Sequence, residues 1–436
     1  MDSESTEHLV EELHHRPHKS ISEKERESDC PEDLVEELHY REGRGISKAW
    51  RWFGHRQGQN LTSPKLVNVD DFRAKGDHEA DDTESFSKAW REACDSKNSV
   101  LVVPRNRTYL LKPITFSGPC KSNFTLKVYG TIQASRRRSD YQKHRQHWLL
   151  FENIQNFTVE GGGIINGNGR KWWENSCKVN KTLPCMHAPT AMTFFNCNNL
   201  RVANLWIKNA QQMHLTFQKC VNVKASNLVV TAPWHSPNTD GIHVTETQNI
   251  QIHNCVIRTG DDCISIVSGS ENVEATDITC GPGHGISIGS LGAGNSNDYV
   301  SNVIVNRALL SGTTNGLRIK TWQGGSGHAR NITFQNVEMH NVKNPIIINQ
   351  YYCDKKGSPC SEQASAVKVS NVVYKNITGI SASEEAINFK CSRSVPCQEI
   401  WLEDVNLVRQ EDASVKASCE NVRLTNQGKV SPQCLE

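Results

Sequence analysis

The sequence has no long hydrophobic run, almost no net charge and none of the cysteine doublets that bind zinc. No stretch of about 18 consecutive apolar residues occurs, so no transmembrane helix is predicted. The formal net charge of +2 gives no bulk attraction to nucleic acid or to an anionic membrane. Without C-x-x-C pairs, the common structural zinc sites are excluded. We therefore expect no nucleic-acid or membrane partner, no metal and no cofactor.

Cysteine, by contrast, is abundant. The chain has 16 cysteines, and several stand close together: Cys177/Cys185, Cys353/Cys360, Cys391/Cys397 and Cys419/Cys434. Short loops between cysteines predict disulfides and an oxidising compartment. Seven N-x-S/T sequons are typical of the same compartment, at Asn60, Asn106, Asn123, Asn156, Asn180, Asn331 and Asn376. We expect a secreted protein, although the first residues, M-D-S-E-S-T-E-H, show no apolar signal segment.

The first 65 residues differ in composition from the rest. They are rich in Glu, His, Lys and Arg, and a short segment, His8–Arg16, is echoed by Asp33–Arg41. Each copy is long enough for one or two helical turns, which bury little apolar surface. The sequence therefore predicts a charged, mobile leader over 1–65 and a folded domain over 66–436.

The folded domain opens with one helix between strands. Alternation predicts strands over Val67–Phe72 and Ser99–Pro104. Between them, Phe86, Ala89, Trp90 and Ala93 fall on one face of a helix. Repeat folds need their open ends covered, so we expect this helix to cap the N-terminal end of a longer stack.

The remainder of the domain repeats a short unit of Asn followed by alternating apolar residues. Copies begin at Asn156, Asn199, Asn222, Asn249, Asn272, Asn302 and Asn331, with weaker ones at Glu399 and Asn421. Most steps are 22 to 30 residues, and one step of 43 holds an insertion around Cys177–Cys185. One coil of this length cannot bury its inward face, but stacked coils bury a continuous one. We predict an all-β, right-handed parallel β-helix, a solenoid with an asparagine ladder along its turns.

Four polar clusters occur in a fixed order within this repeat. They are S-P-N-T-D-G (236–241), G-D-D-C (260–263), G-H-G (283–285) and R-I-K (318–320). Asp240 to Asp262 is 22 residues, and Asp262 to His284 is another 22. Because neighbouring strands lie about 4.8 Å apart, a coil of that length stacks the three side chains on one face.

The carboxylates of these clusters suit acid–base chemistry. Adjacent residues of a straight strand point to opposite faces, so Asp261 and Asp262 share a site only if the chain bends, which Gly260 permits. Like charges in close proximity raise at least one pKa, which yields the acid and base pair of a glycosidase. The alternative for an Asp-Asp pair alone is a turn cap or a calcium site. Register with Asp240 and His284 favours catalysis.

The other residues suit a substrate that carries carboxylates. Arg318 and Lys320 are one residue apart and share a strand face, where a bidentate fork and a point charge can bind an anionic sugar. Tyr352 follows about one coil later and can stack on a sugar ring or belong to the core. Asn238 can orient Asp240 or only shape the turn.

In this order, N-T-D-G, G-D-D-C, G-H-G and R-I-K resemble the four hallmark motifs of the polygalacturonases, the pectin-cleaving glycoside hydrolases. The segment V-D-D-F-R-A-K-G-D (69–77) resembles the start of the plant members. The resemblance covers residues from about 67 to the C-terminus. It implies a right-handed parallel β-helix that hydrolyses α-1,4-galacturonosyl linkages of polygalacturonate and pectin by single-displacement inversion. We expect a monomer that acts in the cell wall.

The resemblance also implies a role for each motif residue. Asp261 would be the proton donor, Asp240 and Asp262 would activate water, and His284 would support the acid. Arg318, Lys320 and Tyr352 would bind substrate, with Asn238 beside them. We expect endo action. Two alternatives stay open: a lyase with Arg318 as base and calcium on the aspartates, and a non-catalytic pectin-binding protein.

Overall fold

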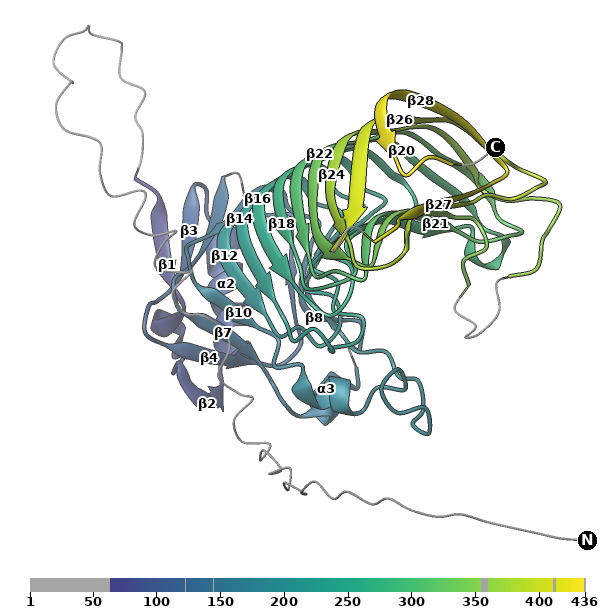
Figure 1. Cartoon of the computed structure of the whole chain (residues 1–436). Coiled ribbons are helices and arrows are strands. Elements are labelled where there is room, and N and C mark those ends of the chain that lie inside the picture. Colours follow the sequence, from purple (N-terminus) through teal and green to yellow (C-terminus); the bar gives the residue numbers. More distant parts are fainter. Residues whose placement is uncertain (1–62, 122, 144, 354–359, 411–412, 435–436) are drawn as a thin grey trace, which may run out of the picture. The chain divides into compact units, whose positions relative to one another are not determined.

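The computed structural model describes residues 63–121, 123–143, 145–353, 360–410 and 413–434 (Figure 1). Residues Thr62–Glu436 form one compact unit. The leader predicted over 1–65 lies outside the described residues up to residue 62, so that prediction stays untested. In the described part, no helix is long and apolar enough to cross a membrane.

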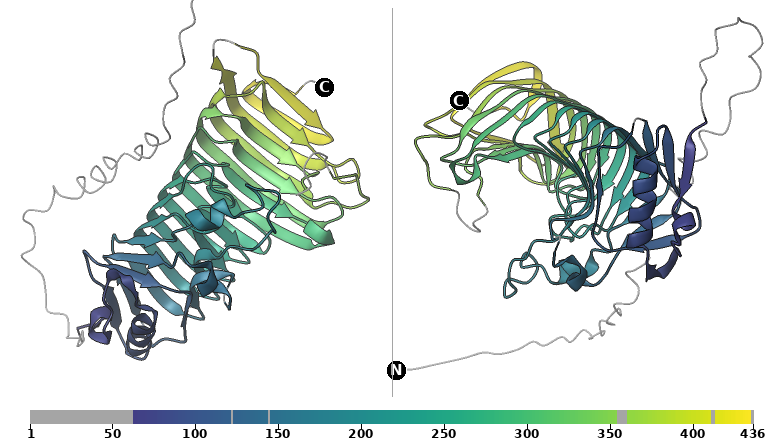
Figure 2. Two further views of the ribbon diagram at one scale, coloured as in Figure 1. Left: turned by 90° about the horizontal axis from the view of Figure 1, so that it is seen from below. Right: turned by 180° about the vertical axis from the view of Figure 1, so that it is seen from behind.

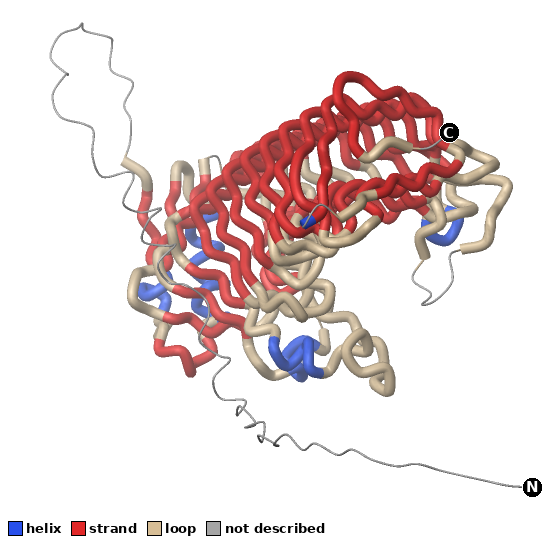
Figure 3. The backbone as a smooth tube through the Cα atoms, viewed as in Figure 1, coloured by secondary structure: helices blue, strands red, loops and turns tan. Residues whose placement is uncertain are grey.

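The unit is built almost entirely of parallel strands in two sheets (Figure 3). The larger, here called sheet A, consists of β1 (Lys65–Asn68), β2 (Asp77–Asp81), β3 (Ser99–Val103), β4 (Thr108–Leu111), β6 (Phe124–Val128), β7 (Thr131–Ala134), β9 (Gln155–Glu160), β10 (Ile164–Asn166), β12 (Asn198–Lys208), β14 (Val221–Thr231), β16 (Gln248–Arg258), β18 (Ser270–Cys280), β20 (Asn297–Ser311), β22 (Ser326–Val342), β24 (Lys368–Ser381), β26 (Cys397–Arg409) and β28 (Val422–Ser431). Sheet B consists of β5 (Ile114–Ser117), β8 (His147–Glu152), β11 (Thr190–Phe195), β13 (Leu215–Gln218), β15 (Ile242–Thr245), β17 (Ile264–Ile266), β19 (Ile286–Leu291), β21 (Asn315–Thr321), β23 (Asn344–Asn349), β25 (Glu385–Lys390) and β27 (Lys416–Glu420).

From β11 onward the chain alternates between the two sheets, and each pair of strands makes one coil. Each strand pairs in parallel with its counterpart in the next coil, as in Ile242↔Ile264↔Ile286. Figure 2 shows the coils following one another in chain order, from purple to yellow. The predicted parallel β-helix is confirmed, and the 22-residue spacing is its coil length at the site.

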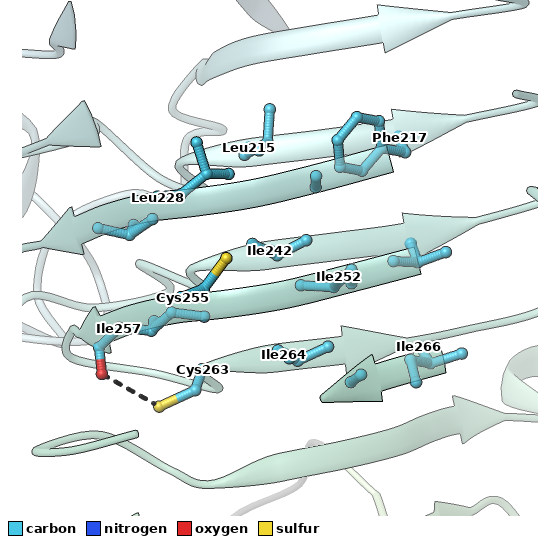
Figure 4. Close-up of a cluster of buried hydrophobic side chains, with 14 of the residues drawn as sticks. Leu215, Phe217, Leu228, Ile242, Ile252, Cys255, Ile257, Cys263, Ile264 and Ile266 are labelled. Carbon is cyan, nitrogen blue, oxygen red and sulfur yellow. Dashed lines mark hydrogen bonds between the residues drawn. The ribbon is translucent and has the colours of Figure 1, made fainter. Parts of the chain in front are cut away.

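The core lies between the two sheets and is filled by the alternate residues of each strand. Figure 4 shows side chains of successive coils stacked on one another, among them Leu215, Ile242 and Ile264. All three are fully buried. A single coil would leave this face in water, so burial of about 25 cal/mol per Å² is realised only when coils stack. The alternation in sequence is the direct cause of the two-sided strands.

Helix α2 (Thr83–Cys94) forms where the amphipathic pattern predicts it, with Phe86, Ala89, Trp90 and Ala93 buried. The ring of Trp90 contacts Phe124 and Phe157 with centroids 4.7 and 5.7 Å apart, and its indole N–H donates to the Ser117 carbonyl at 3.1 Å. A second helix, α3 (Arg170–Glu174), lies just before the Cys177–Cys185 insertion.

The strand predicted over Val67–Phe72 is only partly correct. Strand β1 ends at Asn68, and Val69–Phe72 is a 3₁₀ turn, η2. The Asn68 side chain accepts a hydrogen bond from the Asp70 amide at 3.0 Å, which starts the turn. Arg73 then adopts a left-handed conformation with φ 71° and ends it. Further 3₁₀ turns are η3 (Arg138–Tyr141) and η4 (Ala293–Asn295).

The predicted asparagine ladder is present. Each side-chain amide donates to the side-chain oxygen of the preceding coil at 2.9–3.2 Å, through Asn156, Asn199, Asn222, Asn249, Asn272, Asn302, Asn331 and Asn371. Every one of these residues except Asn371 was visible as a repeat start. These residues have φ between 52° and 58°, a left-handed bend that asparagine tolerates better than most residues. The ladder thus provides both the turn and its hydrogen bonds.

Within the described residues, five disulfides tie neighbouring segments, and three of them are pairs that proximity in sequence predicts. These three are Cys177–Cys185, Cys391–Cys397 and Cys419–Cys434. The other two, Cys94–Cys120 and Cys263–Cys280, join cysteines further apart. Cys353 and Cys360 border residues 354–359, which are not described, so that predicted pair stays a prediction. The disulfides are consistent with an oxidising compartment.

Candidate active site

The first carboxylate of the site, Asp240, lies just before β15 and is almost buried, with 8% of its surface exposed. Its Oδ2 accepts a hydrogen bond from the Ser265 hydroxyl at 2.8 Å. Its backbone carbonyl accepts from the His214 amide at 2.8 Å and lies 3.0 Å from that residue's Nδ1. Burial, followed by the charges of Asp261 and Asp262, raises the pKa of Asp240 to about 8.

The chain bends between β16 and β17, as the glycine before the two aspartates predicts. Gly260 is needed for close approach, because a Cβ atom there would lie 2.1 Å from the Ser236 carbonyl oxygen. The bend brings Asp261 and Asp262 to one side, with the nearest ligand atoms of these two and His284 within 4.8 Å of one another. The prediction that both carboxylates share one site is correct.

Asp262 is the most enclosed of the three carboxylates, at 1% exposed. Its Oδ1 accepts from an Arg318 guanidinium nitrogen at 2.7 Å and from the Ser287 hydroxyl at 2.9 Å. Its Oδ2 accepts from Lys320 Nζ at 2.9 Å. Both cations predicted to share a strand face therefore converge on this one buried carboxylate.

Asp261 is paired with His284 instead. The His284 Nδ1 lies 3.0 Å from Asp261 Oδ1, and the His284 backbone amide donates to the Asp261 carbonyl at 2.8 Å. Burial opposes ionisation of Asp261, but the His284 hydrogen bond and the charges of His284 and Lys320 lower its pKa below the ordinary value. The same hydrogen bond, acting against burial, raises the pKa of His284.

Register places the other predicted residues around this centre. Asp240, Asp262 and His284 each stand two residues before the in-register column Ile242↔Ile264↔Ile286, as their 22-residue spacing predicts. Tyr352 lies with its ring centroid 5.4 Å from Lys320 Nζ and 6.2 Å from the Trp322 ring. It therefore belongs to the site rather than to the core.

Asn238 differs from these residues. It is half-buried with φ 55°, and among the described residues no hydrogen bond joins its side chain to Asp240. Of the two roles open to it, shaping the turn has structural support, because the left-handed bend sets up the S-P-N-T-D-G loop.

Asp261, Asp262 and His284 have the composition of a cation site, so we tested whether a metal fits them. Their ligand atoms lie within 4.8 Å of one another. However, Arg318 and Lys320 already donate to both oxygens of Asp262, and His284 lies against Asp261. Protein cations thus occupy the positions from which a metal would neutralise these carboxylates.

Comparison with known proteins agrees with this geometry. Residues 94–431 match the model of glycosyl hydrolases family 28. The chain belongs to glycosyl hydrolases family 28. It is 61% identical over 376 residues to polygalacturonase QRT2 of Arabidopsis thaliana, covering 86% of this chain and 85% of the relative. It is 58% identical over 371 residues to polygalacturonase-2 of Solanum lycopersicum, covering 85% and 81%. The predicted assignment to the polygalacturonases is confirmed.

Solved structures share the fold of this family-28 enzyme. A polygalacturonase from Erwinia carotovora ssp. carotovora superposes with a TM-score of 0.69 at 22% identity, covering 85% of this chain and 99% of that chain. An endo-xylogalacturonan hydrolase from Aspergillus tubingensis gives 0.70 at 21% identity, covering 83% and 100%. At these identities the likeness establishes the β-helix architecture alone.

The family-28 site also contains residues that sequence reasoning missed. Ser265 and Ser287 donate to Asp240 and Asp262, and His243 Nδ1 lies 2.7 Å from Ser265 Oγ. A usable signal existed, because His243, Ser265 and Ser287 each stand three residues after Asp240, Asp262 and His284 and repeat the same 22-residue spacing. They occupy one register column of sheet B, and this column lies next to the carboxylates.

Proposed function

We propose that the chain hydrolyses α-1,4-galacturonosyl linkages of polygalacturonate and pectin by single displacement with inversion, acting in the interior of the polymer during cell-wall modification. The observation that carries this proposal is the convergence of Arg318 and Lys320 on buried Asp262, beside Asp261 and below Asp240. The cations suited to an anionic substrate therefore lie at the same place as the groups suited to acid–base chemistry. The proposal starts from the polygalacturonase family assignment and from the parallel β-helix.

The state of Asp262 favours water over the protein as the nucleophile. A covalent nucleophile needs a carboxylate oxygen free to attack, yet both Asp262 oxygens accept charge-assisted hydrogen bonds. Asp240 keeps one oxygen that is not hydrogen-bonded among the described residues, since Ser265 donates to the other. Asp240 and Asp262 together suit the binding and deprotonation of a water molecule. Asp261 and Asp262 have ligand atoms within 4.8 Å of each other, closer than the roughly 6.5–9.5 Å usual for inverting pairs, so the anomer first released tests this mechanism.

Asp261 suits the role of acid because its side chain is 20% exposed and so can reach a glycosidic oxygen. In the free site the electrostatics run the other way, because the pKa of Asp240 is raised and that of Asp261 is lowered. Substrate can reverse this order. A galacturonate carboxylate bound at Lys320 neutralises one of the charges that lowers the pKa of Asp261, and the excluded water raises that pKa further.

Endo action is supported by the extent of sheet B on both sides of the site. Strands β5, β8, β11 and β13 precede the carboxylates, and β23, β25 and β27 follow them. A polymer lying across the strands can therefore extend in both directions. Helix α2, with Trp90 against the aromatic residues of the first coils, suits the predicted role of an N-terminal cap.

The test is product analysis on polygalacturonate. We expect new reducing ends, a mixture of intermediate oligomers at early times, and β-anomeric products seen first by proton NMR. Early release of monomer alone would contradict endo action, and α-anomeric products would contradict inversion. Unsaturated products that disappear with a chelator would support the lyase alternative, although both Arg318 contacts are donations from a charged group, which leaves it a poor base. Binding without cleavage would support the non-catalytic alternative.

A further inference from the structure

The outer face of sheet B carries a second cationic position two coils beyond the R-I-K motif. Strand register joins Lys320 to Asn349 and Asn349 to Lys390. Phe389 points into the core and is fully buried, so Lys390 faces the same side of the sheet as Lys320. Two strand spacings put the backbones of the two lysines about 10 Å apart along the coil axis.

The second position repeats the lysine–tyrosine pairing of the first. Lys320 Nζ lies 5.4 Å from the ring centroid of Tyr352, and Lys390 Nζ lies 5.6 Å from that of Tyr351. Asn349, which stands between the two lysines, accepts a hydrogen bond from the Tyr351 amide at 2.9 Å. This hydrogen bond holds the turn after β23, where Tyr352 lies beside Lys320 and Tyr351 lies beside Lys390.

A polar pocket of about 400 Å³ surrounds the second position. Its walls are Tyr351, Cys360, Glu362, Lys390, Arg393, Glu420 and Asn421. One of the two acids in this wall, Glu362, is already engaged. It accepts from the Tyr351 hydroxyl at 2.6 Å and from the Arg393 and Ser394 amides at 2.9 and 3.0 Å. These hydrogen bonds, the first above all, lower the pKa of Glu362 and fix it as part of the wall.

The two cations of the pocket, Lys390 and Arg393, are not engaged as Glu362 is. Among the residues that the structure describes, no carboxylate forms an ion pair with Lys390 or Arg393, although Glu420 is the in-register neighbour of Lys390. On the outer face of sheet A, by contrast, Lys375 pairs with Glu403 at 2.8 Å. Lys390 and Arg393 thus present donors to the pocket.

We propose that Tyr351, Lys390 and Arg393 form an additional subsite that binds the carboxylate of a further uronate residue of the same polygalacturonate chain. The inference rests on the proposed function. Arg and Lys supply the fork and the point charge that a carboxylate takes, and the half-buried tyrosine ring offers a face to the sugar. A chain held at Lys320 and lying across the strands reaches this subsite only if it is long enough.

The experiment compares kcat/KM for galacturonate oligomers of three to seven units between the wild type and Lys390→Met, which keeps the side-chain length and removes the charge. One lost charge-assisted contact corresponds to about a tenfold change. We expect the ratio of heptamer to trimer kcat/KM to fall about tenfold in Lys390→Met and by a similar factor in Arg393→Met. The loss should appear in KM rather than in kcat.

Lys224→Met is the matched control, because Lys224 is an exposed lysine on the outer face of sheet A. Its length dependence should equal that of the wild type. An equal loss at every oligomer length in Lys390→Met and Arg393→Met, or no loss at any length, would overturn the subsite. Failure of the wild type to cleave any oligomer or polygalacturonate would instead overturn the proposed function, and the subsite with it.

Discussion

Two columns of stacked polar residues run along this solenoid, and they differ in what each coil contributes. On sheet A, successive coils contribute the same residue, asparagine, and each amide donates to the one before. On sheet B, successive coils contribute different residues: His243, Ser265, Ser287 and Arg318 share one register column. In the first column, the asparagine side chains form hydrogen bonds with one another. In the second column, Ser265 donates to Asp240, and Ser287 and Arg318 both donate to Asp262.

The difference shows how one repeat geometry serves stability in one place and chemistry in another. Asparagine carries a donor and an acceptor, so identical copies at the strand spacing leave no group unpaired. Unlike residues at the same spacing cannot pair with copies of themselves and instead place acid, base and cation within reach of one substrate. Identical residues in successive coils stabilise the β-helix, and unlike residues in successive coils form the candidate active site.

A second amide ladder shows that sheet A tolerates such a departure without becoming a site. It runs through Asn204, Asn227 and Asn254, and the next coil has Asp277 instead. Arg307 of the following coil donates two hydrogen bonds to the Asp277 carboxylate, at 2.7 and 2.8 Å. The charge is exposed and paired, so its pKa is lowered and nothing is left for a ligand.

The largest expected effect separates an aspartate of sheet B from one of sheet A. Asp261→Asn removes the proposed acid, and we expect hydrolysis of polygalacturonate to fall by about 10²- to 10⁴-fold with the fold intact. Asp277→Asn is the matched control, since it restores an amide to the second ladder, and activity should stay at the wild-type level. Reducing-end release and thermal unfolding check both variants. Full activity in Asp261→Asn would refute the acid assignment.

The next effect concerns the buried ion cluster. Lys320→Met leaves Asp262 with one cation fewer, and we expect the free energy of unfolding to fall by about 3 kcal/mol. Adding Asp262→Asn should recover most of that stability, because the unpaired charge is gone, while activity stays lost. Denaturant titration and activity assays on the single and double variants measure this. Equal stability of the two variants would mean that the cluster is not coupled as described.

A smaller effect is expected in the asparagine column. Asn249→Ala removes two side-chain hydrogen bonds and puts alanine at φ 58°, for a loss of about 2–3 kcal/mol. Asn249→Gly removes the same hydrogen bonds without the backbone strain and should lose about 1 kcal/mol less. Activity should not change in either. Equal losses in the two variants would show that the left-handed bend contributes nothing.

The last effect is a pH-dependent gain in stability. The folded-state pKa of Asp240, about 8, lies above the unfolded value near 4. Its contribution to stability is therefore complete below about pH 4 and is lost as pH rises toward 8. Asp240→Asn has no such group, so its Tm should clearly exceed that of the wild type at pH 8, where about four pKa units correspond to about 5 kcal/mol, and match it at pH 4. A difference that is constant with pH would contradict the raised pKa.

The sequence predicted the coil from its period, the ladder from its asparagines and the site from the spacing of Asp240, Asp262 and His284. It predicted too long a strand at Val67–Phe72, because the Asn68 cap and the left-handed Arg73 compete with alternation. It also missed His243, Ser265 and Ser287, because each looks like an ordinary strand residue on its own, although together they repeat the 22-residue spacing of the site. Helix α2 was predictable because its apolar face has the helical period.

The length of a coil and the residues that share a column can be predicted without coordinates, because both follow from a period along the chain. Which members of adjacent columns form hydrogen bonds with each other depends on how the coils fold against one another. Lys320 and Arg318 meet Asp262 rather than open solvent, and His284 meets Asp261 rather than its register partner Asp262. The reason is that side-chain reach across a bend, which the period does not encode, sets these distances.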